Sequence, residues 1–201
     1  MKAQILIFDG FDELDAIAPF EVLQTAAAVG ADIQAELVTL AEVPEVATAH
    51  GMRVLPHGQL DPHQPPDLLI VPGGGWSNRS QQGAWAEAQR GQIPAIIAQM
   101  HQTGVLIASV CTGAMLVAAA GLLNQRHAVT HHAAIDDLAA SGAQVVKARV
   151  VDEGDIVTAG GVTSGLDLAI WLLERYFGST VVQEVEQELE YQRREPLWQV
   201  V

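Results

Sequence analysis

The feature that most constrains the fold is a series of short apolar runs that alternate with longer stretches of helical composition. The runs are apolar at both odd and even positions, so both faces of the strands they form are expected to be buried. Strands of this kind, alternating with helices, form a mostly parallel sheet covered on both sides, which predicts an α/β fold. The expected strands cover residues 3–8, 33–40, 67–74, 105–110, 128–131, 148–152 and 155–161, with a hairpin through residues 50–51 to residue 55. The expected helices cover residues 15–29, 80–103, the stretch after Cys111, a stretch ending near Ala140, and residues 163–177 and 179–192.

The composition predicts one domain that spans residues 1–201. The 201 residues are 49% hydrophobic, which is enough for a sizeable core, and no repeat or linker divides the chain. A net charge of −14 disfavours nucleic acid and anionic membranes as partners, because binding phosphate needs clustered Lys and Arg. The first residues lack a signal-peptide pattern, so we expect a cytoplasmic protein. The single cysteine excludes an internal disulfide and a thiolate-rich zinc site.

That single cysteine, Cys111, stands where a nucleophile is often placed. An apolar run, residues 105–110, leads into it, and Thr112, Gly113 and a helical pattern follow. This order is similar to the strand–turn–helix elbow that presents a nucleophile at the edge of a sheet. The unpaired N–H groups of the helix N-terminus favour negative charge, so we expect the pKa of the thiol to be lowered. The alternatives are a cysteine that only packs in the core and, less favoured, a membrane span over residues 105–123.

Two further loops are expected at the same sheet edge, where ligands bind in this class of fold. The loop after the third expected strand contains Gly74 and Gly75, whose N–H groups, with that of Thr112, are candidates for an oxyanion hole. A plain glycine turn is the alternative. The third glycine of a dinucleotide-binding fingerprint is replaced by Asn78, and no Walker sequence occurs, so no cofactor is predicted.

The loop after the first strand is acidic and contains Asp15. This residue either caps the helix that starts there or acts as a general acid beside the thiol. Among the seven histidines, His131 is the best candidate for a neighbour of the site, and Trp76 lines a pocket or packs in the core. No pair of histidines has the spacing of a zinc peptidase helix, so no metal site is predicted.

Several segments together resemble the ThiJ/PfpI superfamily, relatives of the class I glutamine amidotransferases. They are LIFDGFDELDAIAPFEVL (6–23), LLIVPGGG (68–75), SVCTGAMLVAAAGLL (109–123), AVTHHAAIDDL (128–138), RVVDEGDIVTAGGVTSGLDLAIWL (149–172) and VEQELEY (185–191). They span most of the chain in the family's order. The resemblance implies a flavodoxin-like three-layer sandwich, a homodimer and a small-molecule substrate.

Within the superfamily, the chain is most similar to the isocyanide hydratase branch. It has Leu-Asp-x-x-x-Pro around Asp15, Ser-Val-Cys-Thr-Gly around Cys111, the pair Thr130-His131, and Thr-x-Gly-Gly-hydrophobe-Thr-x-Gly with Val162 as the hydrophobe. The resemblance implies that the Cys111 thiolate attacks the isocyanide carbon, that Asp15 supplies a proton and that water releases an N-substituted formamide. It also makes Trp76, His131 and Val162 pocket residues.

The sequence departs from that branch at two positions and leaves other functions open. His132 replaces a Trp, and Gly75 replaces a non-glycine residue, so the substrate is not fixed. An amidase or protease of the superfamily typically has His directly after the cysteine, where this chain has Thr112. The alternatives are such an enzyme, a glyoxalase-like enzyme, and a thiol-based oxidative-stress sensor or chaperone without turnover.

Overall fold

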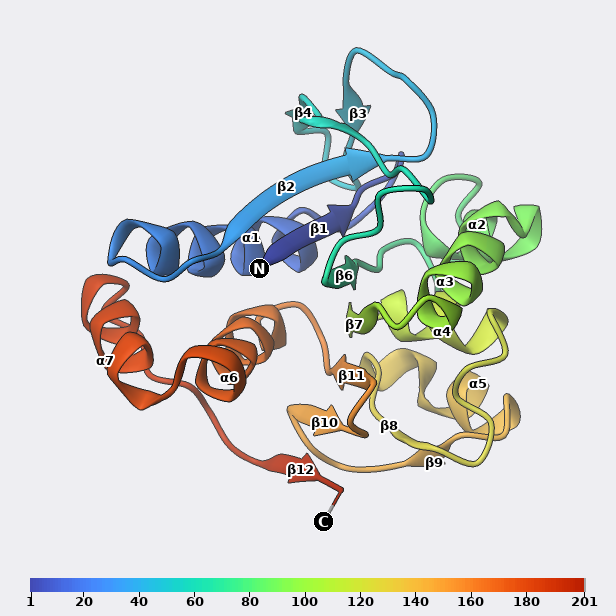
Figure 1. Cartoon of the computed structure of the whole chain (residues 1–201). Coiled ribbons are helices and arrows are strands. Elements are labelled where there is room, and N and C mark those ends of the chain that lie inside the picture. The colour runs from blue at the N-terminus through green and yellow to red at the C-terminus, as the bar shows by residue number, and fades with distance from the viewer. Residues whose placement is uncertain (201) are drawn as a thin grey trace.

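The computed structural model describes residues 1–200, which form an eight-stranded sheet between two layers of helices (Figure 1). Neighbouring strands are parallel throughout, except that β10 and β11 run antiparallel. In spatial order the strands are β12 (Leu197–Gln199), β10 (Val150–Asp152), β11 (Ile156–Ala159), β7 (Leu106–Val110), β6 (Leu68–Val71), β1 (Lys2–Leu6), β2 (Gln34–Thr39) and β5 (Gly58–Gln59). The expected α/β fold with a mostly parallel sheet is therefore confirmed.

The helices divide into two groups that cover opposite faces of the sheet (Figure 1). One group packs around α1 (Glu13–Ala28), with α6 (Ser164–Phe177) and α7 (Ser179–Glu188). The other group consists of α2 (Ala84–Arg90), α3 (Gln92–Gln102), α4 (Gly113–Ala119) and α5 (Ile135–Ala140), which follows the short 3-10 helix η1 (His132–Ala134). Two small sheets lie outside the main one, β3 (Val46–Ala47) with β4 (Arg53–Val54) and β8 (His127–Ala128) with β9 (Gln144–Val145).

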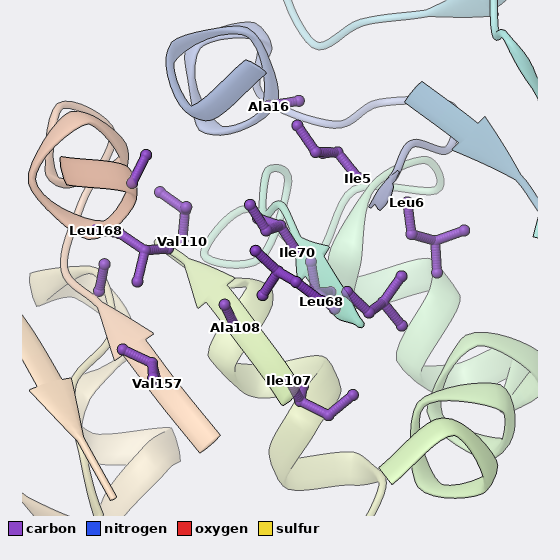
Figure 2. Close-up of a cluster of buried hydrophobic side chains, with 14 of the residues drawn as sticks. Ile5, Leu6, Ala16, Leu68, Ile70, Ile107, Ala108, Val110, Val157 and Leu168 are labelled. Carbon is purple, nitrogen blue, oxygen red and sulfur yellow. The ribbon is translucent and has the colours of Figure 1, made fainter. Parts of the chain in front are cut away.

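The core lies on both faces of the central strands (Figure 2). Ile5, Ile70 and Val110 are fully buried and point toward α1 and α6, where they meet Ala16 and Leu168. Residues adjacent to these along the same strand, such as Leu6 next to Ile5, point to the helices of the opposite layer, since successive side chains alternate across a strand. Central strands buried on both faces explain why the runs in the sequence are apolar without alternation.

The structure corrects several expected elements. The run 128–131 forms only the two-residue β8, which pairs with β9 outside the main sheet. The helices expected across 80–103 are present as α2 and α3, divided at Gly91, whose φ of +78° ends α2 in the left-handed region. The strand β12 was not expected at all. It lies at the sheet edge, where it pairs with β10.

Candidate active site

Cys111 occupies a sharp corner between β7 and α4. Its φ is +57°, in the left-handed region that non-glycine residues rarely adopt. Its backbone N–H donates to the carbonyls of Ala159 (3.1 Å) and Gly160 (2.8 Å), and its own carbonyl accepts from the Thr130 hydroxyl at 2.9 Å. These contacts hold the strained conformation in place, as at nucleophile corners of other folds. The strand-to-helix elbow expected from the sequence is therefore present.

Gly113 makes the corner possible because it packs directly against the neighbouring strand. A Cβ at this position would lie 2.0 Å from the carbonyl oxygen of Val71, at the end of β6. No side chain fits at that distance, so the first turn of α4 can approach β6 only with glycine. The close approach also brings the loop after β6 next to Cys111.

The carboxyl group of Asp15 lies beside the Cys111 thiol, close enough for each group to affect the pKa of the other. Asp15 is the third residue of α1 and is fully buried. Its Oδ2 accepts from the backbone N–H of Gly73 at 2.9 Å, whereas Oδ1 is buried and has no hydrogen-bond partner within residues 1–200. The alternative that Asp15 caps its helix is wrong. Asp12 is the N-cap, and its Oδ1 accepts from the N–H of Leu14 at 3.3 Å.

Burial dominates the electrostatics of this pair. It raises the pKa of Asp15 from 3.8 to about 8, with the charge of Asp12 adding to the rise, while the Gly73 N–H and the thiol act in the opposite direction. Burial also raises the pKa of Cys111 to about 12, with the charge of Asp15 adding to the rise. The lowered thiol pKa expected from the sequence is therefore wrong. The N–H groups of Val162 and Thr112 do favour the thiolate, but they do not offset its burial.

The glycine loop after β6 is held by the elbow itself. The N–H of Gly74 donates to the Thr112 hydroxyl oxygen at 2.9 Å, so it is engaged and not available for a substrate in this arrangement. The N–H of Gly75 has no hydrogen-bond partner among residues 1–200 and lies at the wall of the cavity. Gly75, rather than Gly74, is thus the residue of this loop whose N–H has no partner among residues 1–200.

A cavity of about 400 Å³ lies over the Cys111 sulfur, which is large enough for a small ligand. It brings together the three loops that were expected at the carboxyl ends of β1, β6 and β7. Its wall consists of Gly10, Asp12, Thr48, Ala49, His50, Gly74, Gly75, Trp76, Ser77, Asn78, Ser80, Gln82, Cys111, Thr112, His131 and Val162.

The three pocket residues expected from the resemblance all lie in this wall. Trp76 is 7% exposed, donates from Nε1 to Asp137 at 2.7 Å and packs edge-on against a second tryptophan. Val162 has a φ of +40°. His131 accepts the N–H of Ala133 at Nδ1 (3.3 Å), so the proton of the neutral ring is on Nε2. Burial, with the charge of the adjacent histidine, lowers the pKa of His131, which favours that neutral form.

Sequence reasoning missed the part played by Glu13 and His50 at the mouth of the cavity. The carboxylate of Glu13 accepts from the backbone N–H of His50 at 2.9 Å and lies 2.6 Å from Nδ1 of its ring. Burial alone would raise the pKa of Glu13, but hydrogen bonds from Thr48 and His50 lower it to about 2. Nothing in the spacing of residues 13 and 50 indicates this contact, because it depends on the loop between β3 and β4.

Residues 1–200 contain neither a candidate metal site nor a helix suited to span a membrane. No group of three or more His, Cys, Asp or Glu side chains is arranged to hold a metal ion in that range. No helix of the same residues is both long and apolar enough to cross a membrane.

Comparison with known proteins places the chain among proteins with this fold. The model of the DJ-1/PfpI family matches residues 1–175. Isonitrile hydratase of Pseudomonas putida is 33% identical over 191 residues, which are 95% of this chain and 78% of that protein. The HTH-type transcriptional regulator CdhR of Pseudomonas aeruginosa is 28% identical over 196 residues, which are 95% of this chain but only 55% of the regulator. Among solved structures, a ThiJ/PfpI family protein from Pseudomonas syringae has a TM-score of 0.82 at 25% identity, covering 97% of this chain and 76% of that one.

Proposed function

This chain belongs to the DJ-1/PfpI family, and from that premise we propose that it is a cysteine-dependent hydratase that converts an isocyanide into an N-substituted formamide. The similarity to an isonitrile hydratase supports this reaction, although the relatives also include a transcriptional regulator. We further propose that the protein acts as a homodimer on a small molecule, without a cofactor.

The observation that carries the proposal is the contact of Cys111 with an acid instead of a base. The thiol lies beside the buried carboxyl group of Asp15, whose Oδ1 has no hydrogen-bond partner within residues 1–200, and no hydrogen bond joins the thiol to His131 or another histidine of that range. Hydrolysis of an amide needs a proton for a leaving amine and a base for water, which a Cys–His pair supplies. Addition to an isocyanide expels no leaving group. It needs a nucleophile and one proton donor, which are the two groups that this site pairs.

The reactive form of the pair carries one negative charge, with the proton on Asp15 and the charge on sulfur. The sulfur of Cys111 bonds to the terminal carbon of the isocyanide while Asp15 transfers its proton to that carbon, which gives a thioimidate and an Asp15 carboxylate. The carboxylate then takes a proton from water as the water oxygen adds to the same carbon. The nitrogen acquires a proton from the added hydroxyl group, the carbon–sulfur bond breaks, and the formamide leaves with the thiolate and the protonated acid restored.

The remaining site residues position this chemistry. The hydroxyl of Thr112 fixes the glycine loop through the Gly74 N–H, so Thr112 acts on the geometry of the loop. We assign to the unpaired N–H of Gly75 the role of stabilising negative charge that develops on the added oxygen. The N–H groups of Thr112 and Val162 favour the thiolate over the thiol. Trp76 and His131 bound the cavity in which the substrate is held.

The test is turnover combined with titration of the thiol in wild type and Asp15→Asn. Wild type is expected to hydrate a small isocyanide with a kcat/KM that rises through about pH 8, where the pair loses its first proton. Asp15→Asn is expected to lose this activity, because the proton donor is gone, while alkylation of Cys111 by iodoacetamide shifts to lower pH, since the charge of Asp15 no longer raises the pKa of the thiol. An inactive variant with an easily ionised thiol distinguishes a lost acid from a damaged fold.

The control is Cys111→Ser, which is expected to abolish both hydration and labelling. The same preparations are offered peptide, glutamine and 2-oxoaldehyde substrates. Turnover of one of these without hydration of an isocyanide would refute the proposed function and favour an amidase or glyoxalase-like enzyme. Reversible oxidation of Cys111 with no turnover of any substrate would favour a thiol-based sensor.

A further inference from the structure

His50 lies at the mouth of the cavity above Cys111, and the mechanism above gives it no role. Its ring Nδ1 and its backbone N–H both contact the carboxylate of Glu13, at 2.6 and 2.9 Å. The hydroxyl of Thr48 donates to the same carboxylate. One carboxylate in the first turn of α1 therefore fixes both the loop at residues 48–50 and the orientation of the imidazole ring.

The second ring nitrogen of His50 remains free. Nε2 makes no hydrogen bond to any of residues 1–200, and 75% of the side chain is exposed. The hydrogen bond to Glu13, with the charges of Glu13 and Asp12, raises the pKa of His50. Because Nδ1 faces the carboxylate, Nε2 is the ring atom left for a ligand at the entrance of the cavity. It accepts a hydrogen bond when the ring is neutral and donates one when the ring is protonated.

The part of the cavity wall that follows the glycine loop is also polar. It consists of the side chains of Ser77, Asn78, Ser80 and Gln82, none of which has a side-chain hydrogen bond except the one that Ser80 accepts from the N–H of Gln82 at 3.2 Å. An alkyl or aryl group against this wall would remove polar groups from water without giving them new partners, which is unfavourable. A substrate that carries an acceptor group gains a hydrogen bond instead.

Charges at the mouth limit the substrate to an uncharged one. Asp12 and Glu13 are both acidic, and only one positive charge, that of protonated His50, faces them. His131, across the cavity, tends to be neutral because burial lowers its pKa. The cavity wall contains no Lys or Arg. A carboxylate would therefore meet a net negative mouth, and like charges repel at short range.

We propose that His50, oriented by Glu13, is a specificity-determining residue that forms a hydrogen bond through Nε2 with an uncharged polar group of the substrate. The site then selects a small polar electrophile, of the class of an amide- or hydroxyl-bearing isocyanide, over alkyl, aryl and carboxylate analogues. This inference rests on the proposed hydratase function and specifies its substrate class.

The kinetic test compares three isocyanides of similar size, namely isocyanoacetamide, isocyanoacetate and propyl isocyanide. Wild type is expected to have the highest kcat/KM for the amide. In His50→Leu the ratio of kcat/KM for the amide to that for propyl isocyanide is expected to fall by about 2- to 10-fold, the loss of one ordinary hydrogen bond. His50→Gln, which keeps an N–H donor, is expected to restore part of the ratio. The matched control is Gln81→Leu, an exposed residue outside the cavity wall, which is expected to leave the ratio at the wild-type value.

A binding test separates this inference from the proposed function. N-formylglycinamide and N-propylformamide are compared as protectants of Cys111 against iodoacetamide, which requires no turnover. Stronger protection by the glycinamide in wild type, lost in His50→Leu, would support recognition by His50 even if no isocyanide were hydrated. Equal protection by the two formamides, or a preference that His50→Leu leaves intact, would overturn the inference whatever the enzyme turns over.

Discussion

Replacing Asp15 by Asn is expected to change how the stability of the fold depends on pH. In the folded protein the carboxyl is buried, with a pKa raised from 3.8 to about 8. A raised pKa of an acid means that the native state keeps a proton that the unfolded chain releases. The contribution of the protonated Asp15 carboxyl to stability is therefore complete below its pKa in the unfolded chain. It is lost progressively as the pH rises from that value to the pKa in the folded protein. Asn can still accept the Gly73 N–H, and it has no proton to lose.

The expected magnitude follows from the proton count. Between the two pKa values one proton is bound in the native state and none in the unfolded state, so the free energy of unfolding falls by about 1.4 kcal/mol per pH unit. Between about pH 5.5 and pH 7.5, wild type should therefore lose about 3 kcal/mol relative to Asp15→Asn. The interval ends below the ordinary pKa of a thiol, about 8.5, so ionisation of Cys111 in the unfolded chain does not contribute.

The assay is urea unfolding of both proteins at several pH values, followed by far-ultraviolet circular dichroism. The difference in free energy of unfolding between Asp15→Asn and wild type is the quantity of interest, because other groups that titrate in both proteins cancel. Glu21→Gln, a change of the same chemistry on the exposed side of α1, serves as control and should follow the wild-type slope. A difference that stays constant with pH would refute the raised pKa and, with it, the protonated acid on which the proposed mechanism depends.

Two further predictions concern residues that shape the fold around the site. Gly113→Ala should destabilise the protein by several kcal/mol, or prevent folding, because its Cβ would meet the Val71 carbonyl at 2.0 Å. The control is Gly58→Ala, whose Cβ would have no atom within 4 Å and which should change the free energy of unfolding by less than about 1 kcal/mol. Asp167→Ala should cost about 3–5 kcal/mol, because this buried carboxylate accepts from the Tyr191 hydroxyl at 2.9 Å and pairs with an arginine. Thermal unfolding measures the loss of stability in Gly113→Ala and in Asp167→Ala. If Asp167→Ala left the rate of proteolysis near Tyr191 unchanged, the role of Asp167 in holding that segment would be refuted.

The central part of the fold could be predicted from the sequence because its signal is local. The strand β6 is uniformly apolar and β1 and β7 are mostly so, and they are followed by a glycine loop, an acidic loop and the Cys111 corner respectively. The elbow at Cys111 could be predicted for the same reason, since a strand, one nucleophile, a small residue and a helix follow each other without interruption. Parallel topology then brings the three loops to one sheet edge.

The edge of the sheet could not be predicted, because it depends on contacts between distant residues. The strand β12 has only three residues and pairs with β10 across about fifty positions of sequence. The segment before it is held by hydrogen bonds of Tyr191 and the Arg194 N–H to Asp167, at 2.9 and 2.6 Å. Neither the pattern of β12 nor its composition indicates a strand. The N-cap of α1 could not be predicted either. The loop before this helix contains several acidic residues, and the residue at which the helix begins decides which of them is the cap.

The thiol pKa shows how a local argument can give the wrong sign. A helix N-terminus and two N–H donors do face Cys111, as the sequence suggests, but α4 has only seven residues and the thiol is 5% exposed. Burial penalises the charged form more than these dipoles favour it. The same burial acts on Asp15, and each negative charge raises the pKa of the other. The pair therefore holds one charge far more easily than two, so the form with a charged sulfur requires a protonated Asp15. A raised thiol pKa is thus compatible with a nucleophile, provided that the acid beside it keeps its proton until the carbon is attacked.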